Sequence, residues 1–175
     1  MSSGVKQAIA AGLFLLVAAG AFAAQGDKSK PAAHSHFDQF KALAGDWVRQ
    51  DTTGGSPTDL VVNFRVIAAQ SAVVETELPG TDHEMVTIIT RDGEDLSLTH
   101  YCAMGNQPHM KVADKGAGNV VAFKFTGGGN MKSDKEAHMH SVTYTFVDKD
   151  TLKAEWSLYA NGKPSGSMVF TLKRK

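Results

Sequence analysis

Tight turns recur at short intervals along this chain, and segments of alternating character lie between them. Asp92-Gly93 and Asn161-Gly162 are dipeptides that two-residue β-hairpin turns prefer, and Pro79-Gly80 is a further turn signal. Between such turns, the segment Asp59–Ile67 carries an apolar residue at every second position, so its apolar side chains share one face of a strand. This pattern predicts short antiparallel strands joined by hairpins.

Ten strands are predicted in this way. They cover Trp47–Asp51, Asp59–Ile67, Ala72–Leu78, Met85–Thr90, Leu96–Met104, Met110–Ala113, Val120–Phe125, Val142–Val147, Leu152–Tyr159 and Met168–Lys173. One short helix is expected before them, over His34–Leu43, where Phe37, Phe40 and Leu43 recur at a spacing of three. Because an open sheet would leave exposed edges, we predict an all-β fold, a closed antiparallel up-and-down β-barrel of about ten strands with one short N-terminal helix. A β-sandwich is the main alternative.

The N-terminal residues have the pattern of an export signal. Lys6 provides a positive charge, Ala8–Ala19 is apolar, and Ala21-Phe22-Ala23 offers the small residues that signal peptidase recognises. The apolar stretch is short for a retained membrane anchor, which needs about 20 residues. We therefore expect a cleaved signal peptide over 1–23, a disordered linker over 24–33 and one β-barrel domain over 34–175. The expected location is the bacterial periplasm or the extracellular space, without stable membrane insertion after cleavage.

Charge and cysteine content limit the classes of partner and the bonds that can hold the fold together. The chain has 18 basic and 18 acidic residues and a formal net charge of zero, so the basic stripe of a nucleic-acid-binding protein is not expected. Cys102 is the only cysteine, so no intrachain disulfide can form even in an oxidising compartment. The fold must therefore be held by packing. The oligomeric state is left open by these observations.

Gly45-Asp46-Trp47 follows the expected helix and opens the first strand. This arrangement resembles the Gly-x-Trp motif of lipocalins and the wider calycin group. The resemblance implies that Trp47 packs across the closed end of the barrel and that a basic residue of the last strand, Lys173 or Arg174, stacks over its indole. The chain departs from the family in lacking evident second and third lipocalin signature regions, and the disulfide common in secreted lipocalins is impossible here.

A second resemblance concerns His100-Tyr101-Cys102 together with Asn106-Gln107-Pro108. These residues are similar to a signature of uncharacterised secreted bacterial proteins with lipocalin-like barrels. That similarity implies the fold and the compartment, and it brings no known chemistry with it.

The segment Leu98–Met110 (LTHYCAMGNQPHM) holds the only cysteine and two of the seven histidines. On the strand Leu96–Met104, the residues with even numbers share one face, and the leucines among them favour the barrel interior for that face. His100 and Cys102 would then stand about 7 Å apart along the strand, inside the barrel. An ordinary buried cysteine and a hydrogen-bonded core histidine explain the same residues without a binding site.

We expect the interior to bind a small, mostly apolar molecule, with a few polar groups that orient it. The candidate ligand-binding residues are His100, Tyr101, Cys102, Met104, Asn106, Gln107, Phe64, Tyr144 and Trp156. Further apolar residues expected to line the interior are Leu60, Val62, Leu98 and Phe123. Asn106-Gln107-Pro108 is expected to form the loop after the strand, either as an ordinary turn or as a polar rim for the ligand.

The principal alternative is a haem or soft-metal site. Histidine, cysteine and methionine are ligands that Cu(I) favours, and some calycin-like barrels hold haem through one histidine. The candidate metal ligands are His100, Cys102, His109, His138 and His140, with Met104 and Met110 nearby. The histidines of His138-Met139-His140 are explained equally well by a polar loop that runs into a strand.

The third hypothesis is an enzyme that uses His100 or Tyr101. It ranks behind the other two because the sequence contains no recognisable catalytic motif. Glu75 and Glu77 share one face of their strand, which places them either in the interior or on a solvent-facing surface. The glycine run in Thr126–Asn130 is not followed by a helix, so we reject a phosphate-binding loop and expect a flexible loop.

Overall fold

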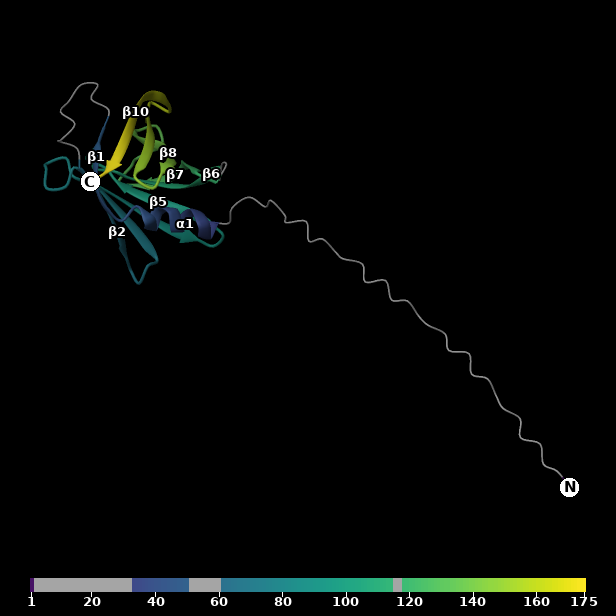
Figure 1. Ribbon diagram of the computed structural model, residues 1–175. Coiled ribbons are helices and arrows are strands. Elements are labelled where there is room, and N and C mark those ends of the chain that lie inside the picture. Colours follow the sequence, from purple (N-terminus) through teal and green to yellow (C-terminus); the bar gives the residue numbers. More distant parts are fainter. Residues whose placement is uncertain (2–32, 51–60, 115–117) are drawn as a thin grey trace.

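The structure is a computed structural model that describes Met1 and residues 33–50, 61–114 and 118–175. In this part of the chain, one short helix precedes ten antiparallel strands that close into a barrel (Figure 1). The elements are α1 (Ala33–Ala42), β1 (Gly45–Arg49), β2 (Val61–Ile67), β3 (Ala72–Glu77), β4 (Met85–Asp92), β5 (Asp95–Tyr101), β6 (Gln107–Asp114), β7 (Val120–Gly129), β8 (His138–Asp148), β9 (Thr151–Ala160) and β10 (Lys163–Arg174). The expected signal peptide, the expected linker up to residue 32, and Leu60 lie outside the described residues.

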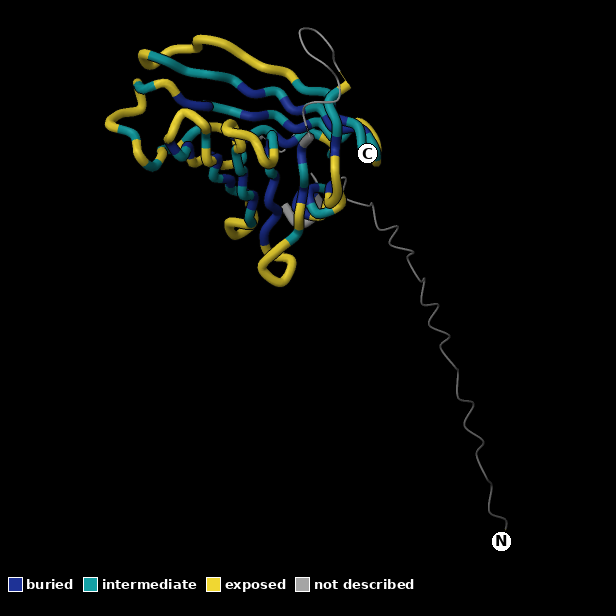
Figure 2. Tube along the Cα trace, turned by 90° about the vertical axis from the view of Figure 1, so that its left-hand side faces the viewer, coloured by how far each residue is buried: buried dark blue, intermediate teal, exposed yellow. Residues whose placement is uncertain are grey.

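The strand order confirms the predicted up-and-down barrel and excludes the sandwich. Each strand pairs with its neighbours in sequence, and β1 pairs with both β2 and β10, which closes the sheet. Closure leaves the middle of the strands buried, while the connections are exposed (Figure 2). Each of the ten predicted segments overlaps one strand. Several strands extend beyond the predicted bounds, whereas β5 ends at Tyr101 and not at Met104 as predicted.

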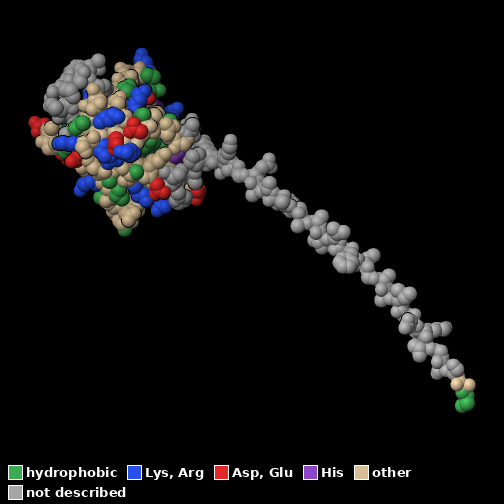
Figure 3. Space-filling model, in the orientation of Figure 1, with side chains coloured by type: hydrophobic (Ala, Val, Ile, Leu, Met, Phe, Trp, Pro, Cys, Tyr) green, Lys and Arg blue, Asp and Glu red, His purple; other side chains and the backbone are tan. Residues whose placement is uncertain are grey.

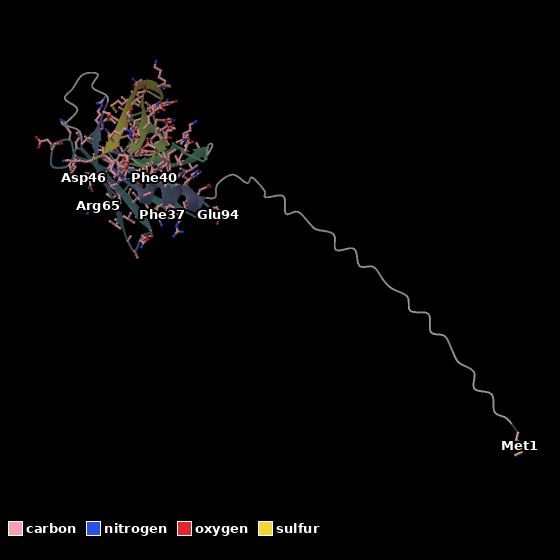
Figure 4. All side chains as sticks on the ribbon, in the orientation of Figure 1. Met1, Phe37, Phe40, Asp46, Arg65 and Glu94 are labelled. Atoms are coloured by element: carbon pink, nitrogen blue, oxygen red, sulfur yellow. The ribbon has the colours of Figure 1, made fainter. Side chains whose placement is uncertain are left out.

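Helix α1 packs on one end of the barrel, which we call the closed end. Phe37 and Phe40, labelled in Figure 4, are buried there, and the Phe40 ring makes edge contacts with Tyr144 and Phe146 at 5.1 Å between centroids. Gln39 donates a hydrogen bond of 2.7 Å to the Gly118 carbonyl, in the connection between β6 and β7. The opposite end of the barrel, where β3, β5, β7 and β9 finish, is called here the far end.

Trp47 and Arg174 join β1 and β10 to this helix. The Trp47 indole is fully buried and donates a hydrogen bond of 2.7 Å to the Leu43 carbonyl. The Arg174 guanidinium lies over the indole, 4.5 Å from the ring centroid, and donates to the carbonyls of Ala42 (2.8 Å) and Ala44 (2.9 Å). Arg174 therefore satisfies backbone acceptors at the end of α1 as well as covering the indole. The other basic residue proposed for the stack, Lys173, instead bonds the Thr151 hydroxyl.

The glycine run at the end of β7 corrects one expectation. Residues Gly127–Gly129 belong to the strand and pair with Gln107–His109 of β6, so this segment is not the flexible loop that its composition suggested. A Cβ atom on Gly129 would lie 2.9 Å from the Gln107 side-chain oxygen, and one on Gly128 would lie 3.2 Å from the Gln107 carbonyl. At Gly128 the close backbone approach of β6 favours glycine, whereas at Gly129 the Gln107 side chain would have to move.

Basic and acidic side chains are mixed over the face seen in Figure 3. Ion pairs of the described residues include Lys111 with Asp92 (2.8 Å) and Lys153 with Glu155 (3.1 Å), and the side chains of both pairs reach the solvent. Among the described residues, none of the helical segments has the length and apolarity required to cross a bilayer.

Candidate functional site

Strands β3, β4 and β5 place a row of polar side chains inside the barrel. The register aligns Glu75 with Thr87, and Thr87 with His100, so the three residues lie side by side on neighbouring strands. All three are almost completely buried, with His100 1% and Glu75 2% exposed. The surrounding interior is otherwise apolar, so these groups are the chemically distinctive part of the core.

Glu75 is bound from across the barrel. The Tyr144 hydroxyl, on β8, donates a hydrogen bond of 2.5 Å to Glu75 Oε2. Burial raises the pKa of Glu75 to about 7 from its ordinary value of 4.5, although the Tyr144 hydrogen bond opposes the rise. The same burial and the nearby carboxyl groups raise the pKa of Tyr144 well above its usual range.

Glu77 lies two residues further along β3, toward the far end. It is 9% exposed, and its Oε1 atom has no hydrogen-bond partner among the described residues. Burial, together with the carboxyl of Glu75, raises the pKa of Glu77 well above 4.5. Cys102 is half-buried and packs against the core, and the Glu77 carboxyl is close enough to add to the rise that burial causes in its thiol pKa.

Only one of the two ring nitrogens of His100 has a hydrogen-bond partner among the described residues. Its Nδ1 lies 2.8 Å from the Thr87 hydroxyl, while its Nε2 is buried without a hydrogen-bond partner among the described residues. The ring packs on Trp156 of β9, with 4.8 Å between centroids, which places it well inside the barrel. Burial lowers the pKa of His100 to about 4, so the imidazole is neutral at physiological pH.

The structure brings together four of the candidate ligand-binding residues and separates others. Phe64, Tyr144 and Trp156 are buried in the same core as His100. Tyr101 and Met104 require correction, because they are 48% and 44% exposed. Tyr101 is on the outer face by strand alternation, and Met104 lies beyond the end of β5, where the alternation no longer applies.

Asn106 and Gln107 bond mainly to the protein itself. The Cys102 N–H donates to the Asn106 carbonyl at 3.1 Å, which closes a turn between β5 and β6. The Asn106 side-chain amide donates to the Ala137 carbonyl at 2.8 Å, and that of Gln107 to the Gly105 carbonyl at 3.1 Å. These amides therefore support the connections at the far end. The expected loop is shorter than predicted, because Gln107 and Pro108 already belong to β6 and pair with the end of β7.

The residues His138 and His140 belong to β8 and do not form the polar loop that was considered for them. His138 Nδ1 lies 2.7 Å from the Glu136 carbonyl and must donate to it, since a carbonyl only accepts. In the neutral ring, His138 Nε2 then accepts from His140 Nδ1, 3.0 Å away. The His140 ring also stacks on Tyr159 at 3.6 Å between centroids. Both nitrogens of His138 are thus used within the protein.

The candidate metal ligands lie in different surroundings. Within the described ranges, no three His, Cys, Asp or Glu side chains are placed to hold a metal ion. His109 is exposed, whereas His100 and Cys102 are in or beside the core.

Sequence reasoning did not select Thr87, and it left Glu75 and Glu77 undecided. Alternation with the buried Val73 was the available signal, because Val73, Glu75 and Glu77 share one face of β3. The signal was weak because Val74 on the opposite face is also buried. Because both faces of β3 carry apolar residues, the sequence does not show which face points into the barrel.

The barrel is consistent with a calycin-like or lipocalin-like fold, as the resemblance implied. No protein-family model matches the chain, and a search of curated proteins gives no significant match.

Proposed function

We propose that this barrel binds a small molecule, apolar over most of its surface, in its interior. One observation carries the proposal: His100 Nε2 is buried in the core without a partner among the described residues. A buried polar atom without a hydrogen bond costs about 1–3 kcal/mol, and such atoms in native proteins usually bond to water or a ligand. A polar group of a bound molecule would satisfy this nitrogen.

The neighbours of His100 support an apolar body for the ligand. Trp156 and Tyr144 lie on the facing strands, and Leu98 and Phe64 continue the same surface. Burial of ligand surface against such side chains contributes about 25 cal/mol per Å². One or two polar contacts then fix the orientation of the bound molecule, as in other concave apolar sites.

The proposal is tested on the full chain purified from its own host. Native mass spectrometry is expected to show a non-covalent adduct that is released on denaturation, and extraction then identifies it. The neutral dye N-phenyl-1-naphthylamine is expected to bind in place of the adduct and to change the fluorescence of Trp156, which touches His100. A protein without adduct that also fails to bind the dye would overturn the proposal.

Two adjacent residues of β5 provide matched variants. His100→Leu removes the inward polar group, whereas Tyr101→Leu changes a side chain on the outer face. We expect His100→Leu to lose most of the natural adduct while Tyr101→Leu keeps it. Equal adduct occupancy in both variants would contradict the proposed role of His100. Near-ultraviolet circular dichroism checks that each variant keeps the native core.

We also propose that the protein is exported and that residues 1–23 are removed. The charge at Lys6, the apolar run Ala8–Ala19 and the small residues before position 24 support this. N-terminal sequencing of the protein from fractionated cells is expected to begin at Ala24. A chain that starts at Met1 in the cytosolic fraction would refute export.

A further inference from the structure

The interior holds two carboxyl groups on one face of β3. Glu75 lies opposite Phe64 and Thr87 in the sheet register, and Glu77 lies opposite Val62 and Met85. Both side chains are removed from water, which is costly for a carboxyl group unless a partner compensates. The hydrogen-bond or ionic partners of the two carboxyls therefore determine which kind of ligand the interior can bind.

Neither carboxyl has a positive partner among the described residues. Glu75 accepts the Tyr144 hydrogen bond, and Glu77 Oε1 has none. The lysine ion pairs found in the described part of the chain lie on the surface, as for Lys41 with Asp38. Burial raises the pKa of both carboxyl groups, and no nearby cation lowers it. Burial therefore favours the protonated, uncharged form of both carboxyls, and a cation that entered the interior would favour their ionised form instead.

The remaining groups around the carboxyls complete a site for a cation. Tyr144 bonds Glu75, and Trp156 makes an edge contact with Tyr144 at 6.4 Å between ring centroids, so aromatic rings, whose faces attract cations, lie beside the carboxyls. His100 adds an independent indication of a ligand, because its buried Nε2 has no partner and its ring touches Trp156. Burial lowers the pKa of His100 and keeps its imidazole neutral, so a positive charge beside the carboxyls would have to come from a bound molecule.

We propose that the interior takes an organic cation, a protonated amine on an apolar body, with its nitrogen against Glu77 and Glu75 and its apolar part on Trp156 and Tyr144. This inference rests on the proposed function and names the chemical class of the ligand. An amine brings the N–H donors that Glu77 Oε1 lacks, and its charge balances an ionised carboxylate. An anionic molecule would meet two acidic groups and is excluded by the same arrangement.

Three probes that share a phenyl ring and differ in charge test the inference by isothermal titration calorimetry on the full chain, emptied of any host molecule. They are 2-phenylethylammonium, 2-phenylethanol and 3-phenylpropanoate. We expect the cation to bind at least tenfold more tightly than the alcohol, and the anion to bind most weakly. An alcohol that binds as tightly as the cation overturns this inference and leaves the proposed function intact. No binding of any probe, together with no dye binding, overturns both.

Glu77→Gln and Glu155→Gln are matched variants for the same measurement. Glu77 is inside the barrel, whereas Glu155 is half-exposed on β9 and paired with Lys153. We expect Glu77→Gln to reduce the preference for the cation over the alcohol to less than threefold, with the affinity for the alcohol unchanged within twofold. Glu155→Gln should keep the full preference. A preference that survives Glu77→Gln overturns the assignment. If Glu77→Gln does not fold, the comparison of the three probes on the wild-type protein still tests the inference.

Discussion

The Tyr144 hydroxyl is the donor that the structure gives to Glu75, and it spans the barrel from β8 to β3. Removal of one partner of a buried hydrogen bond leaves the other unsatisfied, at a cost of about 1–3 kcal/mol. We therefore expect Tyr144→Phe to lower the free energy of unfolding by about 1–3 kcal/mol. Urea denaturation measures the change. Tyr101→Phe, at an exposed site, is the control and should alter stability by less than about 0.5 kcal/mol. Equal stabilities would show that the Tyr144 bond contributes nothing.

At the scale of elements, the connection from α1 into β1 depends on a glycine. Gly45 has a φ of +128°, which favours glycine, and a Cβ atom there would lie 3.3 Å from Arg174 Nη1. We expect Gly45→Ala to destabilise the protein by about 1–3 kcal/mol, because it strains the backbone and displaces the guanidinium from Trp47. Thermal unfolding gives the shift. Gly166→Ala is the control, since a Cβ there meets no atom within 4 Å. A larger loss for Gly166→Ala would contradict this explanation.

The strands could be predicted from sequence because their information is local. Alternation and hairpin dipeptides such as Asp92-Gly93 depend on neighbouring residues only, and all ten segments were identified. The end of β7 was missed because its glycines are explained by Gln107 of β6, a residue distant in sequence. The bond between Tyr144 and Glu75 could not be predicted either, since it depends on which residues face each other across the closed barrel.

At the scale of the whole molecule, buried groups make stability depend on pH in opposite directions: His100 in one direction, and Glu75 with Glu77 in the other. The pKa of His100 is lowered from 6.5 to about 4, so the unfolded chain binds a proton between these values that the folded protein does not. Stability from His100 is present above pH 6.5 and declines as the pH falls toward 4. The pKa of Glu75 is raised from 4.5 to about 7, so the folded protein keeps a proton that the unfolded chain releases. Stability from Glu75 therefore declines as the pH rises from 4.5 to 7.

Glu75→Gln separates the two effects, because glutamine keeps an oxygen for the Tyr144 hydroxyl and removes the titration. Relative to the wild type, the variant should gain stability as the pH rises from 4.5 to 8, by on the order of 3 kcal/mol in total. Its remaining dependence should combine the decline below pH 6.5 caused by His100 with the decline at rising pH caused by Glu77. Urea denaturation at several pH values measures the difference, with Glu155→Gln as the half-exposed control. A difference between variant and wild type that stays constant with pH would show that Glu75 does not titrate abnormally in the folded barrel.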